Sequence, residues 1–465
     1  IDLGRISFGY TPGFPNKVYA HIEGKEGTTG VYLSENFGET WEKRSNRGTN
    51  DSAYYGELTV DPSDSDHLII IDTFAWESRD GGRTWSNMGY DSRHSDDHAV
   101  WFDPQNSEHI YIGGDGGIYE TWDDGNSWRH INNLPITQFY RVQPDNSLPF
   151  YRVCGGTQDN NSLCGPSRTN LVHGIVNSDW EIIVPGDGFE PQIDPDNPDI
   201  IYAQYQYAGL ARYDRRTTER TFITPQPKSG EERFRWNWNS PLLISPHNSK
   251  RIYFGAEKIF RSDDRGDSWT EISPDLRRDI DRNELKVGER VWSVDAVRKN
   301  YWTSPYGSAI VIAESSLQKD LLYVGMDDGL LHISDDGGNN WRKIQKVSSV
   351  PEMTYVSDIT LSVHDKDVAY VSFDNHKRGD YKPYIVKTEN GGKSWSLISG
   401  DLPSRGSVHT VAQDHRDPDL LFAGTEFGVF YTQDGGENWH KFKNLPTVAV
   451  RDIEIQRREN DLVIG

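Results

Sequence analysis

The stretch SRDGGRTW, residues 78–85, decides the fold because near-copies of it recur along the whole chain. The copies are SENFGETW at 34–41, TWDDGNSW at 121–128, SDDRGDSW at 262–269, SDDGGNNW at 334–341, TENGGKSW at 388–395 and TQDGGENW at 432–439. Most of the final tryptophans are about 44 residues apart, and a fixed period of this size is typical of repeat architectures. The step from Trp128 to Trp269 spans about three periods, so it contains two repeats that lack the stretch.

Each repeat carries a second landmark before the stretch, namely two β-rich runs joined by a polar turn. GELTVDPSDSDHLIII (56–71) and AVWFDPQNSEHIYIGG (99–114) are clear cases. Asp-Pro and Asn/Asp-rich turns between such runs indicate hairpins. The unit is therefore strand, polar turn, strand, Gly turn, strand, stretch, strand. Four short antiparallel strands in each unit of this length are typical of a β-propeller blade, so we predict an all-β propeller.

The chain contains nine complete units and one partial unit by this count. We predict blades one to six in 1–273, a charged insertion in 274–302, and blades seven to nine with a partial tenth in 303–465. The partial unit, 450–465, stops after its second strand, and proteins normally cover such an open sheet edge. We expect the remainder of a longer chain or a partner to cover it. The blades form either one large ring or parts of two seven-bladed propellers.

Composition restricts the function classes. The formal charge of −22 argues against nucleic-acid binding, which needs a basic face. We find no apolar run long enough for a membrane-spanning helix.

Cys154 and Cys164 in CGGTQDNNSLC favour a small disulfide loop, with two free thiols as the alternative. A disulfide suits an exported protein, so we expect a secreted, periplasmic or cell-surface location.

The repeated stretch resembles the Asp-box, also called the BNR repeat, with Ser78, Asp80, Gly82, Thr84 and Trp85 at the pattern's positions. The Asp can accept backbone N–H bonds in its own turn, and the Gly can take a positive φ. Ser78 and Thr84 can pair across the turn mouth, and the Trp can pack on the next strand or blade. We interpret the boxes as scaffold, with the structural pairs Asp80 and Trp85, Asp123 and Trp128, Asp264 and Trp269, Asp336 and Trp341, and Asp434 and Trp439.

The same turns raise the question of a metal. A calcium site needs more oxygen ligands at regular spacing than a DDGG turn supplies. We therefore expect no cofactor, with a structural Ca²⁺ as the alternative.

Two unusual loops in the third unit contain candidate catalytic or metal-binding residues. RHSDDHAVWFDP (93–104) brings together His94, Asp97 and His98, which are potential metal ligands, and His94 is also a candidate ligand-binding residue. GGDGG (113–117) places Asp115 in a Gly-rich turn. The structural alternatives are a hydrogen-bonded polar loop and turn capping.

Three further segments fall in the two boxless units and the unit that follows them. They supply the candidate ligand-binding residues Gln158, Asp159 and Asn160, then Asp187 and Glu190, then Arg235, Trp236, Asn237 and Trp238. Aromatic rings beside amide and carboxylate groups suit a sugar or a peptide, while blade packing is the alternative for the two tryptophans.

Glycoside hydrolysis needs two carboxylates about 5–10 Å apart. The candidates are Asp97, Asp115, Asp159, Asp187 and Glu190, and His98 would serve in a lyase.

The combination of Asp-boxes with DDHAVWFDP (96–104), GGDGGIYETWDDGNSW (113–128) and RWNWNSP (235–241) resembles a family of bacterial Asp-box proteins of the sortilin-like (VPS10-type) or glycosyl hydrolase kind. The resemblance covers essentially the whole chain and implies a large exported protein with further blades. GRIS (4–7) is not the arginine motif of sialidases, and the local motifs of xyloglucanases find no match. No catalytic residue is therefore carried over.

These observations lead to a functional expectation with two alternatives. We expect an exported Asp-box β-propeller that binds a carbohydrate or an extracellular protein through loops on one face. The first alternative is a glycan-cleaving enzyme, a glycoside hydrolase ahead of a polysaccharide lyase. The second is an architectural component of a cell-surface or extracellular assembly.

Overall fold

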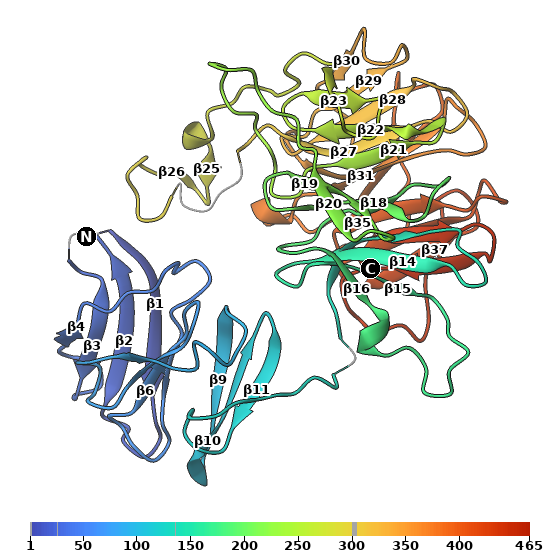
Figure 1. Ribbon diagram of the computed structural model, residues 1–465. Helices are drawn as coiled ribbons and strands as arrows, with labels where there is room; N and C mark the ends of the chain where they lie inside the picture. Colours follow the sequence, from blue (N-terminus) through green and yellow to red (C-terminus); the bar gives the residue numbers. More distant parts are fainter. Residues whose placement is uncertain (1, 26, 135, 300–304) are drawn as a thin grey trace. The chain divides into compact units, whose positions relative to one another are not determined.

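The computed structural model describes residues 2–25, 27–134, 136–299 and 305–465, so the predicted end of the insertion at 300–302 lies outside the described residues. The described residues form nine four-stranded and two two-stranded antiparallel sheets, with three short 3₁₀ segments and no α-helix (Figure 1). This confirms the predicted all-β propeller class. Within this part of the chain, no helix is both long and apolar enough to cross a bilayer.

The chain divides into two compact units, with boundaries that the repeat pattern does not mark. Unit 1 comprises 1–136 and 292–302, and unit 2 comprises 137–291 and 303–465. The strands of unit 1 form three four-stranded sheets. They are β1 (Leu3–Tyr10), β2 (Val18–Gly24), β3 (Gly30–Ser34), β4 (Glu42–Ser45); β5 (Leu58–Val60), β6 (Leu68–Ile70), β7 (Trp76–Ser78), β8 (Ser86–Asn87); and β9 (Asp97–Asp103), β10 (Asn106–Gly114), β11 (Gly117–Thr121), β12 (Arg129–His130).

Unit 2 contains six four-stranded sheets and two two-stranded ones among its described residues. The first three are β13 (Phe139–Pro144), β14 (Arg152–Thr157), β15 (Ser162–Pro166), β16 (Glu181–Val184); β17 (Gln192–Ile193), β18 (Ile200–Tyr205), β19 (Gly209–Asp214), β20 (Glu219–Phe222); and β21 (Leu242–Ser245), β22 (Asn248–Gly255), β23 (Ile259–Ser262), β24 (Thr270–Glu271). The others are β27 (Ala309–Glu314), β28 (Leu322–Met326), β29 (Leu331–Ser334), β30 (Arg342–Ile344); β31 (Tyr355–Leu361), β32 (Ala369–Asp374), β33 (Tyr384–Thr388), β34 (Ser396–Leu397); β35 (Val408–Gln413), β36 (Leu421–Thr425), β37 (Gly428–Thr432), β38 (His440–Lys441); and β39 (Ile453–Gln456) with β40 (Asp461–Ile464).

Seven of these sheets, all except the hairpin of β25 (Lys286–Val287) and β26 (Arg290–Val291), close into one ring. Each innermost strand contacts the innermost strand of the next sheet, in the order β13, β17, β21, β27, β31, β35, β39 and back to β13. Figure 1 shows the C-terminal end beside β14 and β16. The Gln456 amide donates to the Asp145 carbonyl over 2.9 Å, and the Tyr151 hydroxyl lies 3.0 Å from Asp461. The predicted partial unit is therefore the inner half of a seventh blade.

The blade interiors hold the hydrophobic core. Alternating strand residues pack between neighbouring sheets, so that Tyr253, Ile312 and Val324 share one cluster and Tyr323, Val356 and Val371 share the next. Because side chains alternate across a strand, each sheet contributes one set of residues to either neighbour. The core is thus a series of inter-blade layers around the channel.

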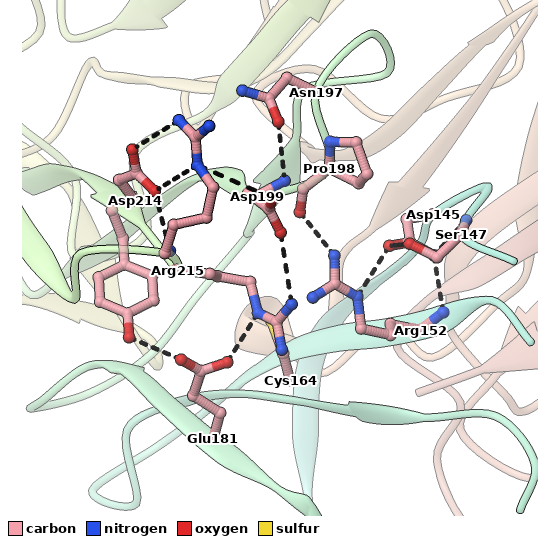
Figure 2. A network of polar contacts seen from close by, with 12 residues as sticks. Asp145, Ser147, Arg152, Cys164, Glu181, Asn197, Pro198, Asp199, Asp214 and Arg215 are labelled. Carbon is pink, nitrogen blue, oxygen red and sulfur yellow. Dashed lines mark hydrogen bonds and ion pairs between the residues drawn. The ribbon is translucent and has the colours of Figure 1, made fainter.

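Polar contacts tie the first two blades of unit 2 together at the end opposite the loops discussed below (Figure 2). Arg152 lies between Asp145, 3.0 Å from its Nε, and the carbonyl of Pro198 on the next blade, which accepts from Nη2 over 2.6 Å. A disulfide joins Cys154 and Cys164, which are directly opposite in the β14–β15 register. The loop that carries Gln158 is thereby held at its base.

The Asp-box turns join the third and fourth strands, as expected for scaffold. Asp80 accepts the backbone N–H groups of Arg83 and Thr84, both over 2.9 Å, and Gly82 takes φ +84°. Ser78 and Thr84 each donate to Asp80 and do not pair with one another as predicted, because the carboxylate lies between them. The Trp85 indole N–H lies 3.2 Å from the Ser45 hydroxyl of the preceding blade.

The charged insertion belongs partly to each unit. Its hairpin, β25 (Lys286–Val287) and β26 (Arg290–Val291), is assigned to unit 2, whereas residues 292–302 are assigned to unit 1. Within unit 1, Arg298 pairs with Glu23 of β2 at 2.7 Å, and Lys25 pairs with Asp295 at 3.0 Å. The last part of the predicted insertion therefore contacts the first blade, whereas the hairpin before it belongs to unit 2.

Candidate binding site at the channel mouth of unit 2

The antiparallel order of each blade decides which loops lie together. The loops between second and third strands and the connections between blades leave the ring at one end, which we call the channel mouth. The turns between first and second strands and the Asp-box turns leave at the other end. The loops that carry Gln158, Asp187 and Trp238 therefore belong to the channel mouth, and the Asp-boxes do not.

An aromatic and amide cluster forms where loops of three blades meet. The Tyr140 hydroxyl at the start of β13 donates to the Gln158 side-chain oxygen over 2.5 Å, and Trp238, in the loop before β21, is hydrogen-bonded to Tyr140. The ring of Tyr207 meets that of Trp238 edge-to-face at 5.0 Å between centroids. The rings of Tyr140 and Phe189 lie 5.1 Å apart. Trp238 is only partly buried, so it can offer ring surface to a ligand.

Carboxylates lie beside this cluster. Asp187 is buried and accepts the backbone N–H of Asp159 over 3.2 Å, while its own N–H donates to Gln206 over 3.2 Å. Burial, followed by the negative charges of Asp187 and Asp159, raises the pKa of Tyr140 above its ordinary value. The Tyr140 hydroxyl therefore stays protonated and remains a hydrogen-bond donor throughout the physiological range.

An arginine crosses the channel below the mouth. Arg141 Nη1 lies 3.3 Å from Asp452, and Nη2 donates over 3.1 Å to the Ser357 carbonyl, three positions away round the ring. Asp452 in turn accepts the Val142 N–H over 2.8 Å. Asp358 of β31 likewise contacts the next inner strand, β35, because it accepts from Thr410 Oγ1 over 2.7 Å. These groups hold neighbouring inner strands together and line the channel.

Two glutamates in the channel have raised pKa values. Burial raises the pKa of Glu190 to about 7, with Arg141 opposing the rise and Asp452 adding to it. Burial together with the charge of Asp452 raises the pKa of Glu454 well above its ordinary value. A carboxyl with a pKa near 7 can donate a proton at neutral pH, which is the property a general acid needs. Glu190 lies just before β17 and is hydrogen-bonded to Gln192 at 3.1 Å.

The sequence analysis missed a second polar group of the mouth. His409 of β35 lies 3.0 Å from Glu426 and 3.3 Å from Arg451. Asp374, at the end of β32, pairs with His376 at 2.6 Å. Burial and then the charge of Arg451 lower the pKa of His409. His409 is one residue of an ordinary inner strand and carries no motif of its own.

The remaining predicted residues of unit 2 serve the scaffold. The Trp236 ring packs on Phe254 at 4.9 Å between centroids and belongs to the aromatic core of its blade. The Asn237 amide donates to the Ser308 hydroxyl over 2.9 Å, and the backbone N–H of Arg235 donates to Glu257 over 2.6 Å. These contacts fix the loop from which Trp238 projects. Trp236 therefore belongs to the packing of its blade, as the alternative predicted, whereas Trp238 belongs to the channel mouth.

The predicted residues of unit 1 separate into two environments. Asp97 is buried and bound by Arg93, at 2.9 Å from Nη2, and by the Ala75 N–H over 2.7 Å. His98 instead pairs with Asp115 at 3.0 Å, and His94 Nδ1 lies 2.7 Å from the Ser95 carbonyl. Among the described residues, His94, Asp97 and His98 do not form a group whose ligand atoms converge. Alternation along β9 separates Asp97 from His98, because neighbouring residues point to opposite faces, and His94 lies in the loop before the strand.

One set of unit 1 side chains does converge with metal-ligand spacing. It consists of His67, Glu77 and Asp124. His67 uses both ring nitrogens, towards Asp61 and Glu77 at 2.8 Å each, and Arg79 pairs with Glu77 and Asp124. The guanidinium already supplies the positive charge that a cation would bring, so the set is a salt-bridge network.

Comparison with protein-family models identifies the repeat. The BNR/Asp-box repeat model matches residues 430–441, and no curated protein matches the chain. Similar solved structures include the GH74 enzyme of Niastella koreensis, at 13% identity over 95% of this chain and 78% of that one, with a TM-score of 0.32. Others are YCF48 from Cyanidioschyzon merolae (12% identity, 82% and 95% covered, TM-score 0.33) and the computationally designed protein Ika8 (11%, 81% and 94%, TM-score 0.42).

The fold and the repeat define the class. The chain is a β-propeller protein with BNR/Asp-box repeats, and unit 2 is a closed seven-bladed ring with a polar and aromatic channel mouth. The finer sortilin-like assignment stays a hypothesis.

Proposed function

We propose that the chain binds a carbohydrate at the channel mouth of unit 2. The observation that carries this proposal is the meeting of Tyr140, Trp238 and Tyr207 beside Gln158 and Asp187. An indole or phenol ring offers a flat apolar face to a sugar ring, while amides and carboxylates pair with hydroxyl groups. Tyr140 lies on β13, and the other residues lie on loops that join strands of the ring.

The charged groups that line the channel of unit 2 also support the proposal. Arg141 pairs with Asp452, and the raised pKa values of Glu190 and Glu454 favour the neutral forms of these two carboxyl groups. Such a polar floor suits an uncharged polar ligand better than a phosphate. An extracellular protein partner is the alternative ligand, and it is distinguished by the test below.

Glycan cleavage is the second candidate function, because Glu190 has a pKa of about 7. Glu190 would protonate the leaving oxygen, and a second channel carboxylate such as Asp452 would act as base or nucleophile. A lyase would instead need a general base. His409 at this mouth is a candidate, because its lowered pKa keeps the imidazole neutral. We also propose export, which the Cys154–Cys164 disulfide supports.

The binding test uses the full chain on a glycan array, followed by titration calorimetry with the best ligand. Trp238→Ala is expected to weaken binding at least tenfold, about 1.4 kcal/mol. Phe222→Ala is the matched control, because this ring is 61% exposed on the outermost strand β20. Equal binding by both variants would place the ligand elsewhere. A protein captured from the native envelope by the wild type, but not by Trp238→Ala, would favour the protein partner.

The enzyme test measures reducing-end release and absorbance at 235 nm over the bound polysaccharides. Hydrolysis requires that Glu190→Gln abolishes release while the affinity stays within twofold of the wild type. A rise in absorbance would indicate a lyase. Binding without either signal would leave a binding module.

A further inference from the structure

A cleft in unit 1 lies outside the site described above. Its volume is about 480 Å³, within the range of small-ligand pockets, about 300–1,000 Å³. It is lined by residues of the second blade and of the segment that leads into it. They are Asn50 before β5, Thr73 and Phe74 between β6 and β7, Trp76 at the start of β7, Asn87 at the end of β8, and Tyr90 just after it.

Aromatic rings form the apolar walls of this cleft. The rings of Phe74 and Tyr90 lie 4.8 Å apart at an angle of 54°. Tyr90 is 63% exposed, and Phe74 and Trp76 are partly exposed. Three accessible rings therefore line one cleft, and each can offer an apolar face to a ligand.

The plane of the Trp76 indole is fixed from behind. The guanidinium of Arg47 stacks on this ring at 3.9 Å, and Arg47 is itself held by the buried Asp72 at 2.7 Å. The charge of Arg47 is therefore paired, and the arginine covers one face of the ring. A ring already held in place costs little further entropy when a ligand stacks on it.

The wall of the cleft is mostly apolar, and three uncharged polar residues contribute to its lining. Asn87 is directly opposite Trp76 in the β7–β8 register, so the two side chains share one face. The Asn50 amide nitrogen donates to the Thr73 hydroxyl over 2.9 Å. This bond leaves the Asn50 carbonyl as an acceptor and the Thr73 O–H as a donor. The lining thus contains donors and acceptors but no charged side chain.

We propose that this cleft is a second carbohydrate-binding site, specific for uncharged saccharides and independent of the channel mouth. A pyranose ring would stack on Trp76 and Tyr90, and its hydroxyls would bond to Asn50, Thr73 and Asn87. The neutral lining disfavours phosphorylated, sulfated and uronic-acid ligands, which would find no cationic partner in it. An apolar peptide side chain would fill the walls but would leave the amides without partners.

The experiment titrates the full chain with cello-, manno-, laminari- and xylohexaose by calorimetry, with glucuronic-acid oligomers as the charged comparison. The background is Trp238→Ala, so that a ligand of the channel mouth does not contribute. Tyr90→Ala and Asn87→Ala are expected to weaken binding of a neutral hexasaccharide at least tenfold and at least threefold. Phe37→Ala, a 73% exposed ring on the first Asp-box turn, is the control and leaves the affinity unchanged.

Several results would overturn the proposal. One is that no neutral hexasaccharide binds in the Trp238→Ala background. Another is that Tyr90→Ala binds with the same affinity as this background protein. A third is that the charged oligomers bind more tightly than the neutral ones. Loss of binding in Trp238→Ala alone, with Tyr90→Ala unaffected, would support the channel mouth and exclude this cleft. Because Tyr90 is largely exposed, its replacement leaves the blade intact, which a matching thermal unfolding curve verifies.

Discussion

The Asp-box tryptophans offer a stringent test of the scaffold interpretation, because the same motif position has different surroundings in different blades. Trp439 is 5% exposed, and its indole N–H donates over 2.9 Å to the Ile398 carbonyl of the preceding blade. Trp41, in the first blade, is 40% exposed and donates only within its own turn, to Gly38 over 3.1 Å. Replacing each by Ala therefore removes different amounts of packing.

The magnitude follows from these two differences. The gap in exposure is about a third of an indole side chain of roughly 250 Å², or about 90 Å². At about 25 cal/mol per Å² this is about 2 kcal/mol, and the inter-blade hydrogen bond adds about 1 kcal/mol. We expect Trp439→Ala to cost about 3–5 kcal/mol, the usual range for a buried Trp, and Trp41→Ala to cost about 2–3 kcal/mol less.

Scanning calorimetry and urea unfolding of the full-length variants measure these costs. Each variant is compared with the wild-type transition of the unit that contains it, since the two units need not unfold together. The same destabilisation for both tryptophans would refute the argument from burial. A cost below about 1 kcal/mol for Trp439→Ala would refute the inter-blade role itself.

Three other predictions follow from the structure. The hydrogen bonds from Ser268 lower the pKa of Asp264 to about 2, so this carboxylate stabilises the fold above about pH 4 and ceases to do so as the pH falls towards 2. Asp264→Asn should lower the unfolding temperature by a few degrees at pH 7, and a difference that persists at pH 2 would contradict this. Replacing both Cys154 and Cys164 by Ser should cost about 2–3 kcal/mol in denaturant unfolding, and an unchanged midpoint would argue against the bridge. Burial raises the pKa of Glu190 to about 7, so its contribution to stability is full below about pH 4.5 and is lost as the pH rises through 7. Glu190→Gln should therefore gain about 2 kcal/mol relative to the wild type between pH 4.5 and 8, and parallel pH profiles of the two proteins would exclude the shift.

The candidate site was only partly predictable from the sequence. Gln158, Asp187 and Trp238 were recognised because aromatic and amide residues cluster in unusual loops. Tyr140 and His409 were missed, because each is one residue of an ordinary inner strand and acquires partners only when distant blades meet. The unit 1 cleft was missed for the same reason. Its aromatic residues are not distinguished from the many others in a chain with 12% aromatics.

The metal candidates show the opposite error. His94, Asp97 and His98 are close in sequence, but His94 lies in a loop, and alternation along β9 sends Asp97 and His98 to opposite faces. Asp97 is occupied by Arg93 and the Ala75 backbone. Closeness along the chain carries little information about convergence once residues lie on a strand, because alternate side chains point to opposite faces.

The sequence by itself determined the blade and its repetition. Turn chemistry, alternation and the Asp-box act over a few residues, so each hairpin is specified locally. Only the tertiary structure decided how the blades group, where the ring closes and which loops meet. Arg141 and Ser357, for example, are 216 residues apart and come within 3.1 Å across the channel. Such contacts depend on the summed packing angles between all the blades of the ring, and no short stretch of sequence encodes that sum.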